Sequence, residues 1–513
     1  MARSSTLVES FQLHVAKVNP SREPRKMKHQ ALTILIIGAL TSVLAEKPKR
    51  MTEKDYLQLI IDSTQPLKFK RGDRLPLYMW SSRINSIADE SEIEKLTAAL
   101  NERGIAVISA WRAGNQKSIE QAIRVAKVQK KLGLRVSVDA TGAVYSFCDG
   151  SEPTGHVAED GTKFFDTSFA SYRKMGCPFA LGERYEPMRQ KLVPFLEAYK
   201  KADVPLSLWT CDWEIDGPIE WNDAWANSKK CTRCREKIKN IDDFTEFQTE
   251  LRKIRSHMQK EVFTKTIQKY YPDALIGNYG VYPHGGYRYW YDYFEKDVPG
   301  TPAETYGKAR YRKWPHEFDS TGYTFSMPVV YTWWDIWTWQ DFEVADYRWT
   351  YNMLLVASNA GKHTKPATPI IPFVHYNLTA PPKAGLPEDL VPMTERAYKE
   401  VLWHMLLRGH DTFAMWCPRR ELAQEARLVQ EVYAASMEFG EFLSKGTPVT
   451  FDVPKPKNKK DAPAVVSGMK MGNKLLVRRT DFTDSKAKVT IEVDGKRVDV
   501  SRLDGKCQIL ELE

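Results

Sequence analysis

The chain has 513 residues, of which 12% are aromatic, and a formal net charge of +10. The chain is longer than an ordinary single-core domain, but its length fits a β/α barrel with a small additional domain. Residues 1–45 carry six basic and two acidic side chains, a net charge of +4, and residues 446–513 carry 14 basic and 10 acidic ones, again +4. Residues 46–445 therefore have a net charge of only about +2. Because the excess of positive charge is small and no nucleic-acid-binding motif is present, we exclude nucleic acid as a partner. An anionic polysaccharide remains compatible with the charge.

Residues 1–45 resemble an N-terminal extension followed by a signal peptide. Arg25, Lys26 and Lys28 flank Met27, a second possible start, and precede the apolar run ALTILIIGALTSVLA, which ends in small residues. The run is shorter than the ~20 residues of a membrane span. We therefore expect a secreted or periplasmic protein, free of the membrane once the signal is removed, whose mature chain begins near Glu46.

From Arg74 onward, apolar runs alternate with amphipathic segments, which is typical of parallel strands joined by helical crossovers. The expected helices include Tyr185–Ala202, Phe244–Tyr271, Tyr347–Gly361, Glu395–Leu407 and Glu421–Leu443. The pattern predicts an α/β fold, a (β/α)8 TIM-type barrel over residues 46–445. Its eight expected strands are LPLYMW (75–80), GIAVISAW (104–111), LRVSVDA (134–140), LSLWTCDWE (206–214), DALIGNYGVY (273–282), TFSMPVVYTWW (324–334), TPIIPFVHYN (368–377) and DTFAMWC (411–417).

Two segments depart from this rhythm. Thr141–Gly176 is a long insertion rich in glycine and polar residues, and loops of that length in compact domains are usually functional. After a charged stretch at 453–463, residues 446–513 show period-two alternation and an Asp-Gly turn at 494–495, which indicates antiparallel β-structure. We expect a C-terminal β-sandwich without a catalytic site.

Side chains suited to sugar chemistry follow the expected strand tips. Asp212 and Glu214 close the fourth strand, two positions apart, so that they point the same way about 6 to 7 Å from each other. Acids after a strand often only cap the next helix, but the carboxyl ends of barrel strands are where such folds keep active sites. The expected substrate-binding side chains are Trp80, Asp139, Tyr279, Tyr282, Tyr331, Trp334, Asp335, His375 and Trp416.

This mixture of acids, phenols and indoles suits cleavage of a glycosidic bond. One protonated carboxyl donates to the leaving oxygen while a second group stabilises the oxocarbenium-like centre. Burial beside Trp213 and the charge of Asp212 would raise the pKa of Glu214 and keep it protonated. We expect a glycoside hydrolase that acts on a polysaccharide or oligosaccharide.

The D-W-E element at 212–214 resembles that of the hyaluronidase family of glycoside hydrolases. GNYGVYP (277–283), Pro328–Tyr331, Ile371–Val374 and Ala414–Trp416 are similar to that family's later motifs. The resemblance implies that Glu214 is the general acid/base and that Asp212 holds the substrate's 2-acetamido group, whose oxygen attacks in a retaining reaction. The chain continues differently, with IDGPIEWNDAW, so the resemblance implies a polysaccharide other than hyaluronan.

Two alternatives stay open. Asp212 as nucleophile with Asp335 as acid/base resembles retaining α-galactosidase-like barrels, which also carry a C-terminal β-sandwich. A non-catalytic barrel that only binds carbohydrate is the other. The aromatic run WWDIWTW (333–339) is expected to form surfaces on which sugar rings stack rather than buried core. For His375, binding of a sugar hydroxyl and a structural hydrogen bond are equally compatible with its position.

Cys231 and Cys234 form a C-x-x-C just beyond the expected acids. As zinc ligands they would need two further partners, and the chain has neither a second C-x-x-C nor a His pair. A redox role lacks a thioredoxin-like setting, so a disulfide or loop clip is favoured. We expect no cofactor and no metal, and the oligomeric state does not follow from the sequence.

Overall fold

The computed structural model describes residues 51–512 apart from several gaps. The gaps are residues 81, 114, 142–151, 169–170, 173, 212–223, 281–320, 365, 380–385, 455–457, 462, 483–487 and 504. Residues 1–50, with the predicted signal peptide, and residue 513 also lie outside the described set. Within that set, no helix has the length and apolarity needed to cross a membrane.

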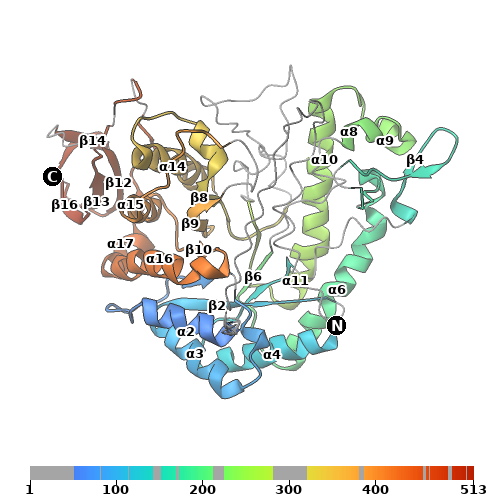
Figure 1. Ribbon diagram of the computed structural model, residues 1–513, viewed down its shortest axis with the longest axis horizontal. Helices are drawn as coiled ribbons and strands as arrows, with labels where there is room; N and C mark the ends of the chain where they lie inside the picture. The colour runs from blue at the N-terminus through green and yellow to red at the C-terminus, as the bar shows by residue number, and fades with distance from the viewer. Residues whose placement is uncertain are drawn as a thin grey trace, which may run out of the picture.

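One parallel sheet of eight strands forms the centre of the molecule (Figure 1). Its spatial order is β7-β6-β3-β2-β1-β10-β9-β8, so successive strands of this sheet are neighbours except for β7 and β8, which lie at its two edges, and β1 lies beside β10, as in a β/α barrel. The strands are β1 (Leu77–Met79), β2 (Ile105–Ala110), β3 (Ser137–Asp139), β6 (Leu208–Cys211), β7 (Leu275–Asn278), β8 (Val329–Trp333), β9 (Phe373–Thr379) and β10 (Ala414–Met415). The prediction of eight parallel strands is confirmed.

Among the described residues, the two outermost strands are not paired with each other, and single backbone hydrogen bonds instead join the β7 segment to residues that precede β8. The N–H of Thr324 donates to the carbonyl of Ile276 over 2.8 Å, and the N–H of Gly280 donates to that of Met327 over 3.0 Å. A side chain at Gly277 would meet the ring of Phe325 at 2.6 Å, so a glycine is needed where β7 and this segment approach. These contacts link β7 with the residues that lead into β8.

Helices cover the sheet and bury its apolar residues in two large clusters. One cluster joins β1, β2 and β8–β10 to their helices, and the other joins β3, β6 and β7 to α4, α6, α10 and α11. The predicted helix 244–271 is one run with a π-helical turn, η5 (Gln259–Thr264), in its middle. The helices are α2 (Glu53–Ser63), α3 (Glu90–Glu102), α4 (Gln116–Lys131), α6 (Gly182–Lys201), α10 (Phe244–Met258), α11 (Lys265–Tyr270), α14 (Ala345–His363), α15 (Glu395–Leu406), α16 (Leu422–Ser436) and α17 (Gly440–Lys445).

The C-terminal residues form two antiparallel sheets. β11 (Thr447–Pro448), β12 (Val465–Met471), β13 (Lys474–Thr480) and β16 (Cys507–Glu511) make one, and the hairpin of β14 (Val489–Val493) and β15 (Lys496–Val500) makes the other. Asp494 and Gly495 at the hairpin turn have φ angles of 52° and 76°, as a type I′ turn requires. The predicted turn and antiparallel structure are confirmed, and the two sheets share one apolar cluster.

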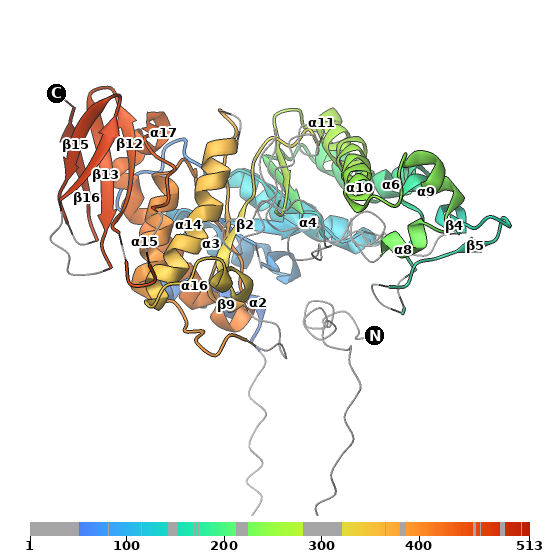
Figure 2. The ribbon, with the colours of Figure 1, turned by 90° about the horizontal axis from the view of Figure 1, so that it is seen from above.

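Loops that follow β3 and β6 build a separate lateral arm. It contains the hairpin of β4 (His156–Val157) and β5 (Lys163–Phe164), the single turns η2 (Glu152–Thr154) and η3 (Pro178–Ala180), and the short helices α8 (Trp225–Ser228) and α9 (Thr232–Lys237). The arm and the C-terminal sheets lie at opposite ends of the molecule in both ribbon views (Figure 2).

Candidate active site

The carboxyl ends of the parallel strands gather several of the predicted site residues at one edge of the sheet. Trp80 and Trp416 directly follow β1 and β10, and Tyr279 follows β7. Tyr331 lies on β8 and is paired in register with His375 of β9. Since all eight strands run the same way, these side chains belong to the face where barrel enzymes hold their sites.

Five of the predicted residues join one aromatic cluster around Phe373. The hydroxyl oxygens of Tyr279 and Tyr331 lie 2.8 Å apart, and the ring of Tyr331 lies 6.1 Å from that of Trp416. His375 packs edge-on against Trp416 at 5.1 Å. Trp80 and Tyr279 both contact Phe373, at 5.2 and 5.1 Å. The tyrosines are buried and the two indoles are half-exposed, so Trp80 and Trp416 present the faces on which a sugar ring could stack.

A buried glutamate that the sequence did not single out holds this cluster from outside the sheet. Glu425 on α16 accepts hydrogen bonds of 2.7 Å from the hydroxyl of Tyr398 and from the backbone N–H of Tyr376. Its carboxylate also lies 3.3 Å from Nδ1 of His375. The only sequence signal for this residue is its position on the apolar face of a helix, because its partners are far away in sequence.

Two N–H groups and one imidazole nitrogen near the ends of β8 and β9 have no hydrogen-bond partner among the described residues. They are Nε1 of Trp334, Nδ2 of Asn377 and Nδ1 of His375, which is close to Glu425 but not aligned with it. Leaving a buried polar group without a partner costs folding free energy.

Asp139 ends β3, which pairs with β6, the strand that the predicted catalytic acids follow in sequence. Burial raises its pKa to about 6, although the backbone N–H and the hydroxyl of Thr141 donate to it over 2.8 and 2.5 Å and oppose that shift. A carboxyl with a pKa in this range can exchange protons near neutral pH.

The predicted catalytic pair lies outside the described residues, since Asp212 and Glu214 fall in the gap 212–223. Tyr282 falls in another gap, and the side chain of Asp335, on η6 (Trp334–Thr338), is also undescribed. The residue before Asp212 is placed: the carbonyl of Cys211 accepts a 2.9 Å hydrogen bond from the N–H of Tyr279. The chain therefore enters the D-W-E element beside the aromatic cluster.

The expectation for the WWDIWTW run is wrong for most of its residues. Trp333, Trp337 and Trp339 are buried, and Trp337 packs against Trp349 with ring centroids 4.9 Å apart. The 3-10 turn η6 folds the run back onto α14, which puts its indoles into the core. Of the four indoles in the run, all of them described, only that of Trp334 keeps part of its surface exposed.

One group of described residues could hold a metal ion, and it lies in the lateral arm. His156, Cys177, Cys231 and Cys234 are all buried, and their ligand atoms lie within 4.8 Å of one another. None of the three cysteines is in a disulfide, so the favoured disulfide between Cys231 and Cys234 is not formed. Hydrogen bonding with Cys177 and Cys234 lowers the pKa of Cys231, and the hydrogen bond with Cys231 raises the pKa of Cys177 to about 12.

No protein-family model and no curated protein sequence matches the chain. Among solved structures, the trehalulose synthase MutB from Pseudomonas mesoacidophila MX-45 is similar at 11% identity and a TM-score of 0.40, covering 86% of this chain and 96% of that one. The isomaltulose synthase from Klebsiella sp. LX3 is similar at 10% identity and a TM-score of 0.41, covering 86% and 98%.

Proposed function

We propose that this chain is a glycoside hydrolase whose substrate, a polysaccharide or oligosaccharide, binds at the carboxyl ends of the parallel strands. The observation that carries the proposal is the aromatic cluster there, in which the half-exposed Trp80 and Trp416 flank the paired hydroxyls of Tyr279 and Tyr331. Aromatic faces beside polar groups are what a sugar ring binds, with its C–H face on an indole and its hydroxyls on donors.

In this proposal, Glu214 and Asp212 carry the chemistry. Their two-residue spacing after β6 would place them about 6 to 7 Å apart, a distance that allows both to contact one sugar. Glu214 donates its proton to the glycosidic oxygen as the bond to the anomeric carbon breaks. The carboxylate then takes a proton from the water that completes hydrolysis.

The hyaluronidase-like D-W-E element adds a more specific proposal for sugars that bear a 2-acetamido group. The acetamido oxygen attacks the anomeric carbon as the leaving group departs, and Asp212 orients the amide and stabilises its positive charge. Water then opens the ring so formed, and the anomeric configuration is retained. No observation among the described residues favours the alternative in which Asp212 is the nucleophile and Asp335 the acid/base.

The proposal is tested by incubating the mature chain with acetamido-containing, sulfated and neutral polysaccharides and following new reducing ends by NMR. We expect sugar products to be released from an acetamido-containing polymer. The first product should keep the anomeric configuration, α or β, of the bond that was cleaved. A trapped covalent sugar on Asp212 would instead support the α-galactosidase-like reaction. Tight binding without any product would leave a carbohydrate-binding barrel and overturn the enzymatic proposal.

Secretion is part of the same proposal. The apolar run before Glu46 is its only support. Expression of the full chain in a bacterial host, followed by N-terminal sequencing of the exported protein, should give a start near Glu46. A full-length product that stays in the cytoplasm would contradict it.

A further inference from the structure

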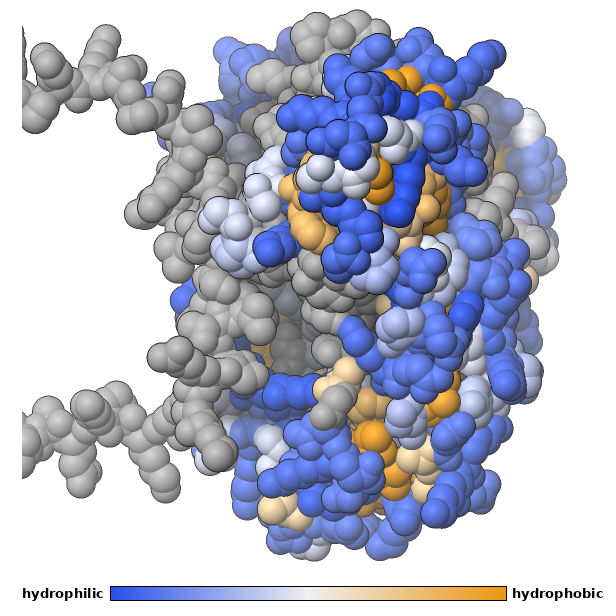
Figure 3. Space-filling model, turned by 90° about the vertical axis from the view of Figure 1, so that its right-hand side faces the viewer, coloured by the Kyte–Doolittle hydropathy of each residue, from blue (hydrophilic) through white to orange (hydrophobic). Residues whose placement is uncertain are grey.

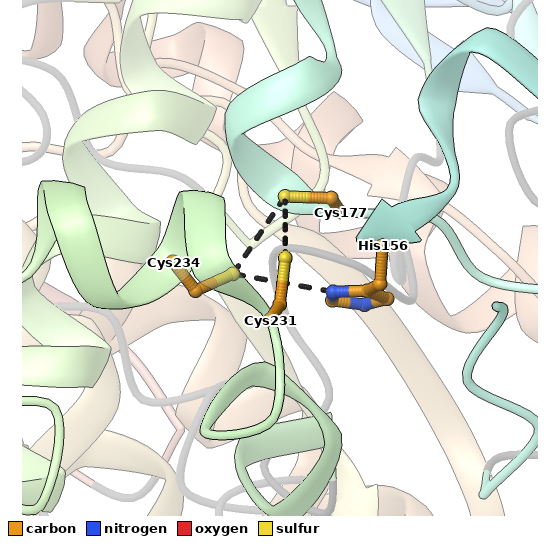
Figure 4. A group of neighbouring side chains, drawn as sticks. All are labelled: His156, Cys177, Cys231 and Cys234. Atoms are coloured by element: carbon orange, nitrogen blue, oxygen red, sulfur yellow. Dashed lines mark hydrogen bonds between the residues drawn. The ribbon is translucent and has the colours of Figure 1, made fainter. Parts of the chain in front are cut away.

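The lateral arm brings together three thiols and an imidazole that are far apart in the sequence. His156 comes from β4, Cys177 immediately precedes η3, and Cys231 and Cys234 stand at the start of α9. Figure 4 shows the four side chains pointing toward one another. None of them is more than 1% exposed.

Their spacing matches the edges of a tetrahedron around one ion. Sγ of Cys177 lies 3.6 Å from Sγ of Cys234 and 3.8 Å from Sγ of Cys231, and Sγ of Cys234 lies 4.0 Å from Nδ1 of His156. Ligands at zinc distances of about 2.3 Å for sulfur and about 2.0 to 2.1 Å for nitrogen are about 3.8 Å and about 3.5 Å from each other. A disulfide needs sulfurs about 2.05 Å apart, so this arrangement suits an ion better than a covalent bond.

The chemistry of the group also selects the ion. Three thiolates and one imidazole are soft ligands that favour zinc over magnesium or calcium, and a tetrahedral set of four leaves no open position for a substrate. The resulting complex would carry one negative charge. Arg233 lies next to it and donates to the carbonyl of Gly155 over 3.2 Å, which places a cation beside His156.

The surroundings hold these side chains in their orientation. The ring of His156 stacks on Phe164 at 5.1 Å, and the N–H of Val157 donates to Sγ of Cys231 over 3.5 Å. The N–H of Cys177 donates to the carbonyl of Thr154 over 2.7 Å. A side chain at Gly176 would meet that same carbonyl at 2.4 Å, so only glycine lets Cys177 approach β4 this closely.

We propose that His156, Cys177, Cys231 and Cys234 bind one zinc ion in a closed structural site. The site links the loop after β3 to the loop after β6, and these strands are neighbours in the sheet. Apart from the cysteines, Ala180 is the one buried residue of the apolar cluster that the described residues form here, with Phe164, Phe179 and Ile241 packed against it. The outer face of this side is mostly hydrophilic (Figure 3). Small units of this kind are commonly held by a metal.

The position of the site gives it a role beyond local stability. The loop after β6 contains Asp212 and Glu214 before it reaches Cys231, so the zinc ion would fix the far end of the segment that bears the proposed catalytic acids. This consequence depends on the proposed function, but zinc binding itself does not.

The test is elemental analysis of the full chain purified without chelators from zinc-supplemented medium. We expect about one zinc per chain that survives dialysis, and tetrahedral visible bands when cobalt replaces it. Less than about 0.1 equivalent of zinc, iron in its place, or a disulfide among these three cysteines in freshly purified protein would overturn the proposal. Enzymatic activity plays no part in this readout.

Variants separate ligation from folding. His156→Ala and Cys177→Ser should weaken zinc binding by about 100-fold or more in competition with a chromogenic chelator, since even outer-shell changes cost 10- to 100-fold. His156→Cys keeps four ligands and should retain zinc. Cys507→Ser and His257→Ala, which alter residues outside the group, should bind like wild type. Unchanged zinc content in both ligand variants would contradict the assignment, and if either is insoluble, the wild-type stoichiometry decides.

Discussion

At the scale of single residues, Asp139 shows how two opposing influences set the proton affinity of a carboxyl. Burial at the tip of β3 favours the neutral form, and the two hydrogen bonds from Thr141 favour the charged form. Burial prevails and the pKa rises from 3.8 to about 6. In the window between these values the native state binds more protons than the unfolded state, so the unfolding free energy falls as pH rises.

Asp139→Asn should therefore gain stability relative to wild type as the pH increases. The asparagine oxygen can still accept from Thr141, while the cost of burying a charge is gone. We expect the difference in unfolding free energy between variant and wild type to grow by about 1 to 3 kcal/mol from pH 4 to pH 7. Urea denaturation at both pH values measures it, and a difference that does not change with pH would show that Asp139 keeps an ordinary pKa.

Sequence patterns predicted the strand-tip residues well because a buried parallel strand ends at a recognisable place in the chain. Tyr331, His375 and Trp416 were placed on their strands from that pattern and lie in one cluster. Glu425 was missed because it is identified only by its contacts with residues 27 and 49 positions earlier. The buried indoles of WWDIWTW were misjudged because the pattern does not reveal the turn of η6 onto α14.

At the scale of elements, the lateral arm depends on contacts between loops rather than on its own secondary structure. The hairpin of β4 and β5 has two residues in each strand and α9 has six, all below the length of an independently stable element. The sequence predicted that the insertion before Gly176 is functional, but not that His156 and Cys177 meet Cys231 and Cys234. No local signal joins ligands separated by 54 residues, as Cys177 and Cys231 are.

Removal of zinc should loosen the arm and leave the sheet intact. With a strong zinc chelator, we expect trypsin to cut at Lys229–Lys239 at least tenfold faster, because a structural zinc supplies folding free energy to its surroundings. Mass spectrometry of the fragments over time measures the rates. Adding zinc back should restore protection. Cleavage that is equally fast with and without the chelator would mean that the arm is held by other contacts.

At the scale of the whole molecule, a buried polar network joins the barrel helices to the C-terminal sheet. Arg478 on β13 donates to both carboxylate oxygens of Glu400 on α15, over 2.8 and 2.6 Å, and Thr480 donates to the same carboxylate. His404 on α15 bridges the hydroxyls of Ser467 and Thr480. Burial lowers the pKa of His404 well below its usual value, so the imidazole stays neutral.

Arg478→Met should destabilise the chain by about 3 to 5 kcal/mol, because it leaves the Glu400 carboxylate buried without its partner. The double variant Arg478→Met, Glu400→Met should recover much of that loss. Lys399→Met is the matched control, because Lys399 is on α15 like Glu400 but forms a partly exposed 2.9 Å ion pair with Glu431 of α16, and its loss should cost less than about 1 kcal/mol. Urea denaturation measures all three. Equal losses for Arg478→Met and Lys399→Met would contradict the importance of the buried network.

The order of strands and helices was largely predictable from the sequence. The contacts between elements far apart in the chain were not. Strands buried on both faces appear as near-continuous apolar runs, and crossover helices appear as amphipathic ones, so the order of eight parallel strands followed from pattern alone. The backbone hydrogen bond between β7 and Thr324 connects residues about 50 positions apart in the chain. The ion pair of Arg478 with Glu400 connects residues about 80 positions apart. Such contacts depend on the folded arrangement and leave no periodic signal.

The central claim, that the strand-end cluster serves a glycosidase with Glu214 as its acid, is tested most directly by Glu214→Gln. On a polysaccharide that the wild type cleaves, we expect the variant to lose at least about 1,000-fold in turnover while its thermal unfolding is unchanged. Glu183→Gln, at an exposed glutamate in the first turn of α6, should keep full activity. Turnover by Glu214→Gln within tenfold of wild type would contradict the account.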